Sequence, residues 1–200
     1  MLSKRSADTL LHVYGRARSL LPGFLRRPLG VFLYITAGCN LNCSYCWQRA
    51  DDSRKEEWIS PTGRALTPEE WALVVERLPR PCFLGVSGGE PTISKAFGPI
   101  LRAARRRAIP VTLNTNGLTL EDPAVRRLIL EGGVRNVSVS LDGFAPLHDA
   151  GRNLPGLFDR VIAGLKALRA EQGGRGSLSL TIKTVLLDAN LEELPRFRDF

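Results

Sequence analysis

Residues 31–46 read VFLYITAGCNLNCSYC, a hydrophobic run followed at once by three cysteines. The run Val31–Thr36 is rich in β-branched and aromatic residues, which is typical of a buried strand. Cys39, Cys43 and Cys46 follow it with the spacing C-x3-C-x2-C. The sequence therefore predicts a strand whose end carries potential metal ligands.

The same order of strand and helix repeats along the chain. Further strands are expected at Cys82–Ser87, Pro110–Thr115, Asn136–Leu141 and Leu178–Leu186. We expect a helix between each pair of strands and one after the last. The first follows the capping box at Thr67. The others lie over Gly98–Arg107, from Asp122 to Gly132, from Val161 to about Gly173, and from Asn190 onward. This alternation predicts an α/β fold with a parallel sheet, either doubly wound and open or a partial TIM-like barrel. In both, the chemistry lies at the carboxyl ends of the strands.

The three cysteines do not complete a tetrahedral zinc site without a fourth ligand, and no nearby histidine offers one. Three thiolates can instead hold three irons of a [4Fe–4S] cluster and leave the fourth iron open. Unligated thiols and a zinc knuckle are the alternatives. Cys82 begins the second expected strand and is interpreted as a buried core thiol.

The segment Cys39–Cys46 resembles the signature of the radical S-adenosylmethionine (radical SAM) enzymes, C-x3-C-x-aromatic-C, with Tyr45 at the aromatic position. Gly88-Gly89-Glu90-Pro91 after the second strand resembles the GGEP motif of that family. Thr115-Asn116-Gly117 follows the third strand and Ser140-Leu141-Asp142-Gly143 the fourth, with His148 and Arg152 spaced as in the peptide- and sulfatase-maturating branch. The resemblance covers roughly residues 31–190 and implies a partial (βα)5–6 barrel.

The resemblance also implies which side chains hold the cofactors. Cys39, Cys43 and Cys46 would bind the cluster. Gly88, Gly89 and Glu90 would hold the amine of S-adenosylmethionine (SAM), and Ser140 and Arg152 its carboxylate. The remaining contacts would be Asp142 to the ribose, Tyr45 and Leu186 near the adenine, and Asn116 ordering the site.

The implied activity is that of an oxidoreductase- or transferase-type radical SAM enzyme. A reduced [4Fe–4S] cluster would cleave SAM to methionine and a 5′-deoxyadenosyl radical, which abstracts hydrogen from a substrate. We expect a peptide, a protein under maturation or a small molecule as substrate, and a flavodoxin- or ferredoxin-type electron donor. A cytoplasmic location suits an oxygen-labile site. The alternatives are a non-catalytic metal-binding or interaction module and an inactive, truncated relative.

The charge is uneven along the 200 residues. The formal net charge is +8, yet residues 1–30 hold six basic residues against the single acid Asp8. We interpret residues 1–30 as a basic extension that packs on the core or, less readily, contacts a membrane. No nucleic-acid partner is expected, because no basic stripe with interleaved aromatic residues is present. Residues 31–200 would form the core domain, truncated at its carboxyl end because no sixth strand is visible.

Overall fold

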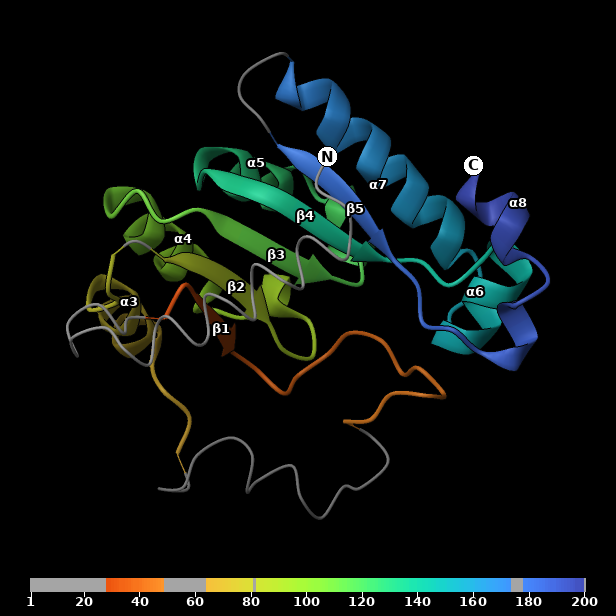
Figure 1. Ribbon diagram of the computed structural model, residues 1–200, viewed down its shortest axis with the longest axis horizontal. Coiled ribbons are helices and arrows are strands. Elements are labelled where there is room, and N and C mark those ends of the chain that lie inside the picture. Colours follow the sequence, from red (N-terminus) through yellow and green to blue (C-terminus); the bar gives the residue numbers. More distant parts are fainter. Residues whose placement is uncertain (1–27, 49–63, 81, 174–177, 200) are drawn as a thin grey trace, which may run out of the picture.

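The computed structural model of this protein describes residues 28–48, 64–80, 82–173 and 178–199. Its five strands are β1 (Gly30–Tyr34), β2 (Phe83–Ser87), β3 (Val111–Thr115), β4 (Val134–Ser140) and β5 (Ser179–Lys183). They form one parallel sheet in the order β1-β2-β3-β4-β5. Figure 1 shows the strands side by side in this order, with β1 and β5 as the outer two. The sheet is not closed within the part of the chain that the structure describes, and this confirms a partial barrel.

Helices connect the strands as the alternation predicts. They are α3 (Pro68–Glu76), α4 (Phe97–Arg106), α5 (Pro123–Glu131), α6 (Ala145–Arg152), α7 (Leu157–Gln172) and α8 (Leu194–Arg198). Helix α3 begins at Thr67 with the predicted capping box, in which Thr67 and Glu70 satisfy each other's backbone donors. Short 3-10 turns lie at Pro91–Ile93 (η3), Leu118–Glu121 (η4) and Asp188–Asn190 (η5).

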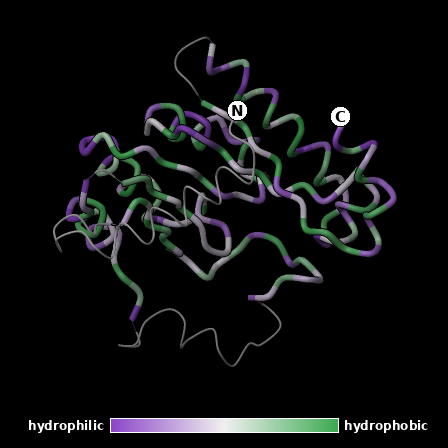
Figure 2. The backbone as a smooth tube through the Cα atoms, viewed as in Figure 1, coloured by the Kyte–Doolittle hydropathy of each residue, from purple (hydrophilic) through white to green (hydrophobic). Residues whose placement is uncertain are grey.

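The two faces of the sheet differ in chemistry. Alternate residues such as Leu84, Val86, Leu113, Val137 and Val139 are fully buried among helix residues. A parallel sheet needs this cover, because its crossover helices pack on it. Hydrophobic and hydrophilic stretches alternate along α4 and α7, as amphipathic helices require (Figure 2). The opposite face of the sheet is more open, with exposed aromatic residues on β1 and β2 and polar residues on β3 to β5.

Three sequence-based expectations about elements were wrong. The helix Ala145–Arg152 was not expected: it has only eight residues, and Gly151 lowers the helix propensity of its last turn. The fifth strand ends at Lys183 and not at Leu186. Asn190 does not begin a helix: it closes η5, where its side-chain oxygen accepts from Leu187 N, and α8 starts only at Leu194, before Pro195.

Cys82 is buried in the hydrophobic core, as predicted. Residues 1–27 lie outside the described residues, so the interpretation of a basic extension stays a prediction. No helix within the described ranges has the length and hydrophobicity to cross a membrane.

Candidate cofactor site

The loop after β1 carries the three cysteines along the carboxyl edge of the sheet. Cys39 is exposed, whereas Cys43 and Cys46 are half-buried. Asn116 Nδ2, from the end of β3, lies 3.7 Å from Cys39 Sγ. Arg152 Nη1, from the end of α6, lies 3.9 Å from Cys43 Sγ. Donors from two other segments therefore reach the sulfurs.

Burial and hydrogen bonding act on these thiols in opposite directions. Burial raises the pKa of Cys39, against hydrogen bonds from Leu41 N and Asn116. Burial also raises the pKa of Cys43, against the positive charge of Arg152. The same positive charge stabilises a thiolate once a metal displaces the proton.

Gly88 and Gly89 let the cysteine loop lie directly against the end of β2. Gly89 N donates to Thr36 O at 2.7 Å, and Glu90 N donates to Gly38 O at 2.9 Å. A Cβ at Gly89 would lie 2.3 Å from Gly38 O, which no side chain tolerates. Gly88 has a φ of +149°, in the region that favours glycine. The glycine pair therefore fixes the position of the loop that carries the thiols.

Glu90 lies inside the fold, with no exposed surface. Its carboxylate accepts from Thr115 Oγ1 at 2.8 Å, from Asn116 N at 2.7 Å and from Thr92 Oγ1 at 2.6 Å. Burial raises its pKa, and these donors oppose that shift. Glu90 thus ties β2 to β3 and orients Asn116 toward Cys39. The structure shows this bridging role, and the predicted contact with the amine of SAM stays a prediction.

Asp142 is the centre of a second buried network, 1% exposed. Its Oδ1 accepts from Val185 N at 3.0 Å. Its Oδ2 accepts from Arg152 Nε at 2.8 Å and from the Tyr45 hydroxyl. Both oxygens are thus used within the fold, and this holds α6, the cysteine loop and the segment after β5 together. The predicted bond to a ribose hydroxyl stays a prediction beside this role.

The same network determines the surroundings of Tyr45 and Arg152. The Arg152 guanidinium lies 5.7 Å from the centre of the Tyr45 ring. Burial, together with the bond to Asp142, raises the pKa of Tyr45, so the hydroxyl stays protonated and donates. Both side chains are half-buried or buried within the loop packing. Ser140 is half-buried at the end of β4, and Leu186 is exposed just after β5.

Two residues that connect the site were not singled out from the sequence. Gly151 O accepts from Ser44 N at 3.0 Å, and a Cβ at Gly151 would lie 2.8 Å from the Tyr45 ring. Asn190 is fully buried and donates to Asp142 O at 2.8 Å and to Val185 O at 2.7 Å. Neither belongs to a motif, and the only signal in the sequence is the type of residue: a glycine in a helix and an asparagine at a turn.

A model of the Radical SAM superfamily matches residues 33–200. The chain belongs to the radical SAM superfamily. An AdoMet-dependent heme synthase of Methanosarcina barkeri is 34% identical over 165 residues, which are 81% of this chain and 44% of that protein. The sporulation killing factor maturation protein SkfB of Bacillus subtilis is 28% identical and covers 94% of this chain and 41% of its own length. The chain thus spans less than half the length of these two curated relatives.

Solved structures show the same fold at low sequence identity. The crystal structure of Streptococcus suis SuiB matches with a TM-score of 0.68 at 17% identity, over 100% of this chain and 43% of that chain. Native anSMEcpe with bound AdoMet matches with a TM-score of 0.62 at 18% identity, over 86% of this chain and 48% of that chain. The superfamily and the partial barrel, both expected from the motifs, are confirmed.

The side chains around the loop fit an iron–sulfur cluster of the radical SAM type. Within the described ranges, no three His, Cys, Asp or Glu side chains are placed to bind one metal ion. A cubane cluster binds each thiolate at a different iron, so its ligands need not converge on one point. Cys46 lies close enough to raise the pKa of Cys39, and Cys39 and Cys46 both raise the pKa of Cys43. Two of the three sulfurs also accept hydrogen bonds, from Asn116 and Arg152. The three cysteines therefore suit a cluster with three protein ligands better than a single zinc ion.

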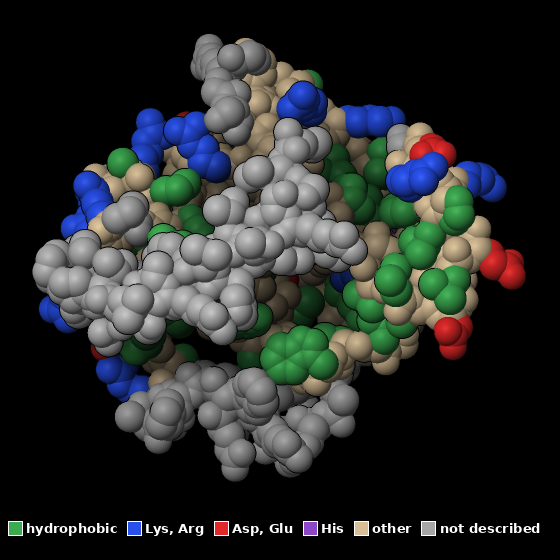
Figure 3. All heavy atoms as spheres, in the orientation of Figure 1, with side chains coloured by type: hydrophobic (Ala, Val, Ile, Leu, Met, Phe, Trp, Pro, Cys, Tyr) green, Lys and Arg blue, Asp and Glu red, His purple; other side chains and the backbone are tan. Residues whose placement is uncertain are grey.

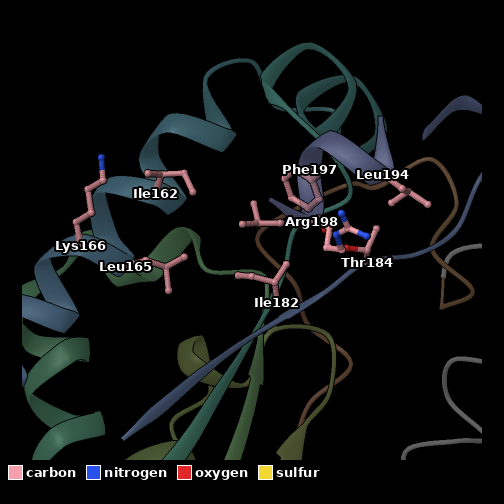
Figure 4. A pocket seen from close by; sticks show the side chains of 9 residues that line it. Ile162, Leu165, Lys166, Ile182, Thr184, Leu194, Phe197 and Arg198 are labelled. Atoms are coloured by element: carbon pink, nitrogen blue, oxygen red, sulfur yellow. The ribbon is translucent and has the colours of Figure 1, made fainter. Parts of the chain in front are cut away.

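An open cavity of about 660 Å³ lies away from this site, between β5, α7 and α8 (Figure 4). It is lined mainly by hydrophobic side chains, among them Ile162, Leu165, Ile182 and Phe197. Ile182 projects from the side of β5 opposite to its neighbour Lys183, because successive strand residues point to opposite faces. The cavity therefore belongs to the helix-covered face of the sheet and not to the edge that carries the cysteines.

Proposed function

We propose that this chain is the radical-generating part of a radical SAM enzyme that acts on a peptide. The observation that carries the proposal is the position of Cys39, Cys43 and Cys46 at the carboxyl edge of the sheet, where Asn116 reaches Cys39 and Arg152 reaches Cys43. When bound and reduced, a [4Fe–4S] cluster would supply the electron for cleavage of SAM into methionine and a 5′-deoxyadenosyl radical, the species that would abstract hydrogen from the substrate.

The residues of this chain position the reactants. Cys39, Cys43 and Cys46 would hold the cluster and leave one iron for the amine and carboxylate of SAM. Gly88 and Gly89 support this by bringing bare backbone to the edge beside the cysteine loop. The other predicted SAM contacts are Tyr45, Glu90, Asn116, Ser140, Asp142, Arg152 and Leu186, which all lie at or near the carboxyl ends of β1 to β5.

Several relatives support a peptide substrate. The comparisons include a PqqA peptide cyclase of Granulibacter bethesdensis, 28% identical, and the SuiB structure bound to its precursor peptide SuiA. For this chain we therefore favour a peptide over a small molecule. We propose a flavodoxin- or ferredoxin-type electron donor, because such proteins are acidic and this chain carries a net charge of +8. A reducing, cytoplasmic setting suits the exposed thiol of Cys39.

The test is anaerobic reconstitution with iron and sulfide, followed by iron analysis and by measurement of dithionite-dependent 5′-deoxyadenosine formation. We expect about four irons per chain and SAM cleavage in the wild-type protein. The triple variant Cys39→Ala, Cys43→Ala, Cys46→Ala should lose both, whereas Cys82→Ala keeps both, because Cys82 lies in the core. SAM cleavage by the triple variant, or a single bound zinc in the wild type, would refute the proposal.

A further inference from the structure

The open face of the sheet has two chemically different halves. The register of β1 and β2 pairs Phe32 with Gly85, and Gly30 with Phe83. Paired residues point to the same face of a sheet, as do residues two apart on one strand, so both rings lie on the open face. Asn114, Ser138 and Thr181 form one row across β3, β4 and β5. The half formed by β1 and β2 is thus aromatic, and the half formed by β3 to β5 is polar.

The aromatic half is exposed and preformed. Phe32 is 57% exposed, Phe83 is 42% exposed, and their ring centroids lie 5.8 Å apart in an edge-to-face arrangement. Each ring lies over a glycine: a Cβ at Gly85 would lie 2.2 Å from Phe32, and a Cβ at Gly30 would lie 2.2 Å from Phe83. The two glycines therefore let the rings lie close against the sheet and present a hydrophobic surface. Figure 3 shows a hollow near the carboxyl ends of the strands, with hydrophobic side chains at its rim.

The polar half holds a cation without an anionic partner. Lys183, the last residue of β5, is exposed, and its Nζ donates to Asn114 Oδ1 on β3 at 2.7 Å. To reach β3 from β5 the side chain crosses β4. Asn114 is neutral, and within the described ranges no carboxylate pairs with Lys183. An ammonium in this position is available to a bound anion.

Ser138 provides an independent sign that this surface is incomplete. It is 1% exposed, its register places it between Asn114 and Thr181, and its hydroxyl has no hydrogen-bond partner among the residues that the structure describes. Its neighbours are paired: Thr181 Oγ1 and Ser179 Oγ both donate to Asn136 Oδ1. Buried hydroxyls are nearly always bonded, so this hydroxyl is expected to pair with a water molecule or with a group of the ligand.

This surface adjoins the proposed cofactor site. Lys183 O accepts from Leu141 N, directly before Asp142. Asn114 lies two residues before Asn116, which reaches Cys39. The register places Asn114 level with Ser87, two residues beyond the Phe32–Gly85 pair and four beyond the Gly30–Phe83 pair. With strands about 4.8 Å apart and residues about 3.3 Å apart along a strand, the ammonium above β3 lies about 8 Å from the Phe32 ring and about 16 Å from the Phe83 ring. A ligand that spans both halves would therefore have its carboxylate end nearest the radical source and its hydrophobic end toward the amino ends of β1 and β2.

We propose that Lys183 and Asn114 bind the carboxylate of the substrate, while Phe32, and beyond it Phe83, receive the aromatic or hydrophobic body that extends from this carboxylate. This specificity site rests on the proposed function for its role in catalysis, but its ligand chemistry follows from the open face alone. The substrate class is therefore a carboxylate attached to a bulky hydrophobic body, present either in an acidic peptide or in a free organic acid.

The experiment measures binding of two fluorescent probes, pyrenebutyrate and its neutral analogue pyrenebutanol, to the full reconstituted protein. Wild-type protein should bind pyrenebutyrate about tenfold more tightly than pyrenebutanol, because only the carboxylate can form a charge-assisted hydrogen bond with the Lys183 ammonium. Lys183→Met should abolish this preference and leave the affinity for the alcohol unchanged. Asn114→Asp should also abolish it, because the new carboxylate would pair with Lys183. The matched control is Lys95→Met, which removes another exposed lysine and should keep the preference.

Two peptides identify the source of the carboxylate. Preference for acetyl-Phe-Glu-amide over acetyl-Phe-Gln-amide indicates a peptide, and preference for pyrenebutyrate alone indicates a small organic acid. Either result supports the site. The site is overturned if pyrenebutyrate binds no more tightly than pyrenebutanol and the Glu peptide binds no more tightly than the Gln peptide.

A second result also overturns the site. If the Lys183→Met variant binds SAM at least tenfold more weakly but keeps its preference for the acidic probe, Lys183 holds the carboxylate of SAM and not that of the substrate. Probe binding requires no SAM cleavage, so failure of this site is distinguishable from failure of the radical chemistry.

Discussion

Asp142 and His148 are buried next to each other behind the cysteine loop, with the imidazole ring beside the carboxylate. His148 has no exposed surface, and its Nδ1 accepts from Asp142 N at 3.2 Å. Within the described part of the chain its Nε2 has no hydrogen-bond partner, and the ring packs edge-on against Phe158. Burial, assisted by the nearby charge of Arg152, lowers the pKa of His148 to about 4. The residue is thus a structural, neutral imidazole rather than a proton carrier.

This pKa makes stability depend on pH in a defined window. Above pH 6.5 the imidazole is neutral in both the folded and the unfolded chain and contributes no pH dependence. Between pH 6.5 and about 4 the unfolded chain binds a proton that the folded protein does not, so the free energy of unfolding falls as the pH falls, by about 1.4 kcal/mol per unit. Chemical denaturation at several pH values measures this slope.

The variant His148→Asn is the matched control for that measurement. Its amide oxygen can accept from Asp142 N in place of Nδ1, but it does not titrate. We expect wild type and variant to differ in slope between pH 6.5 and 4 and to run parallel above pH 7. Identical slopes across the whole range would show that His148 is protonated in the folded protein.

At the scale of elements, the cysteine loop is held by its close approach to the turn after β2. The contacts are two backbone hydrogen bonds from Gly89 and Glu90, and they leave no space for a side chain at Gly89. Gly89→Ala therefore has to displace the loop around Gly38, one residue before Cys39. We expect this variant to fold but to retain less than half of the iron after reconstitution, as measured by iron analysis and thermal unfolding.

A second glycine separates loop displacement from general strain. Gly156 has a φ of +76° and open space around it, so Gly156→Ala adds a backbone cost of about 1–2 kcal/mol without a clash. We expect this control to unfold at a lower temperature but to bind the full amount of iron. Full iron content in Gly89→Ala would mean that the loop tolerates the shift.

The sequence predicts strands and motifs well here and predicts side-chain partners poorly. The five strands and the position of each motif at a strand end follow from periodicity, since burial of alternate residues leaves a clear pattern in the sequence. The bridging by Glu90 and Asp142 does not follow, because a motif shows that a carboxylate is present but not which donors surround it. Helix α6 was missed for a related reason: its stability comes from contacts such as Ser44 to Gly151 and not from its own helix propensity.

At the scale of the whole molecule, the segments after the five strands form one connected edge. Ser44 bonds to Gly151, Asn116 reaches Cys39, and Asp142 accepts from Val185 N. Ordering one of these segments therefore orders the others, because local opening of each would break bonds to its neighbours.

Cluster binding should accordingly protect more than the cysteine loop. We expect amide hydrogen exchange to slow on reconstitution in residues 37–47, 114–117, 140–153 and 184–190 together, since the thiols connect directly or through Asp142 to each of these segments. Helix α5, which packs on the helix-covered face, should exchange at the same rate with and without the cluster and serves as the internal control. The triple cysteine variant treated with the same iron and sulfide should show no change. Protection confined to residues 37–47 would contradict the connected edge, because the loop would then bind the cluster without engaging Asn116 or Arg152.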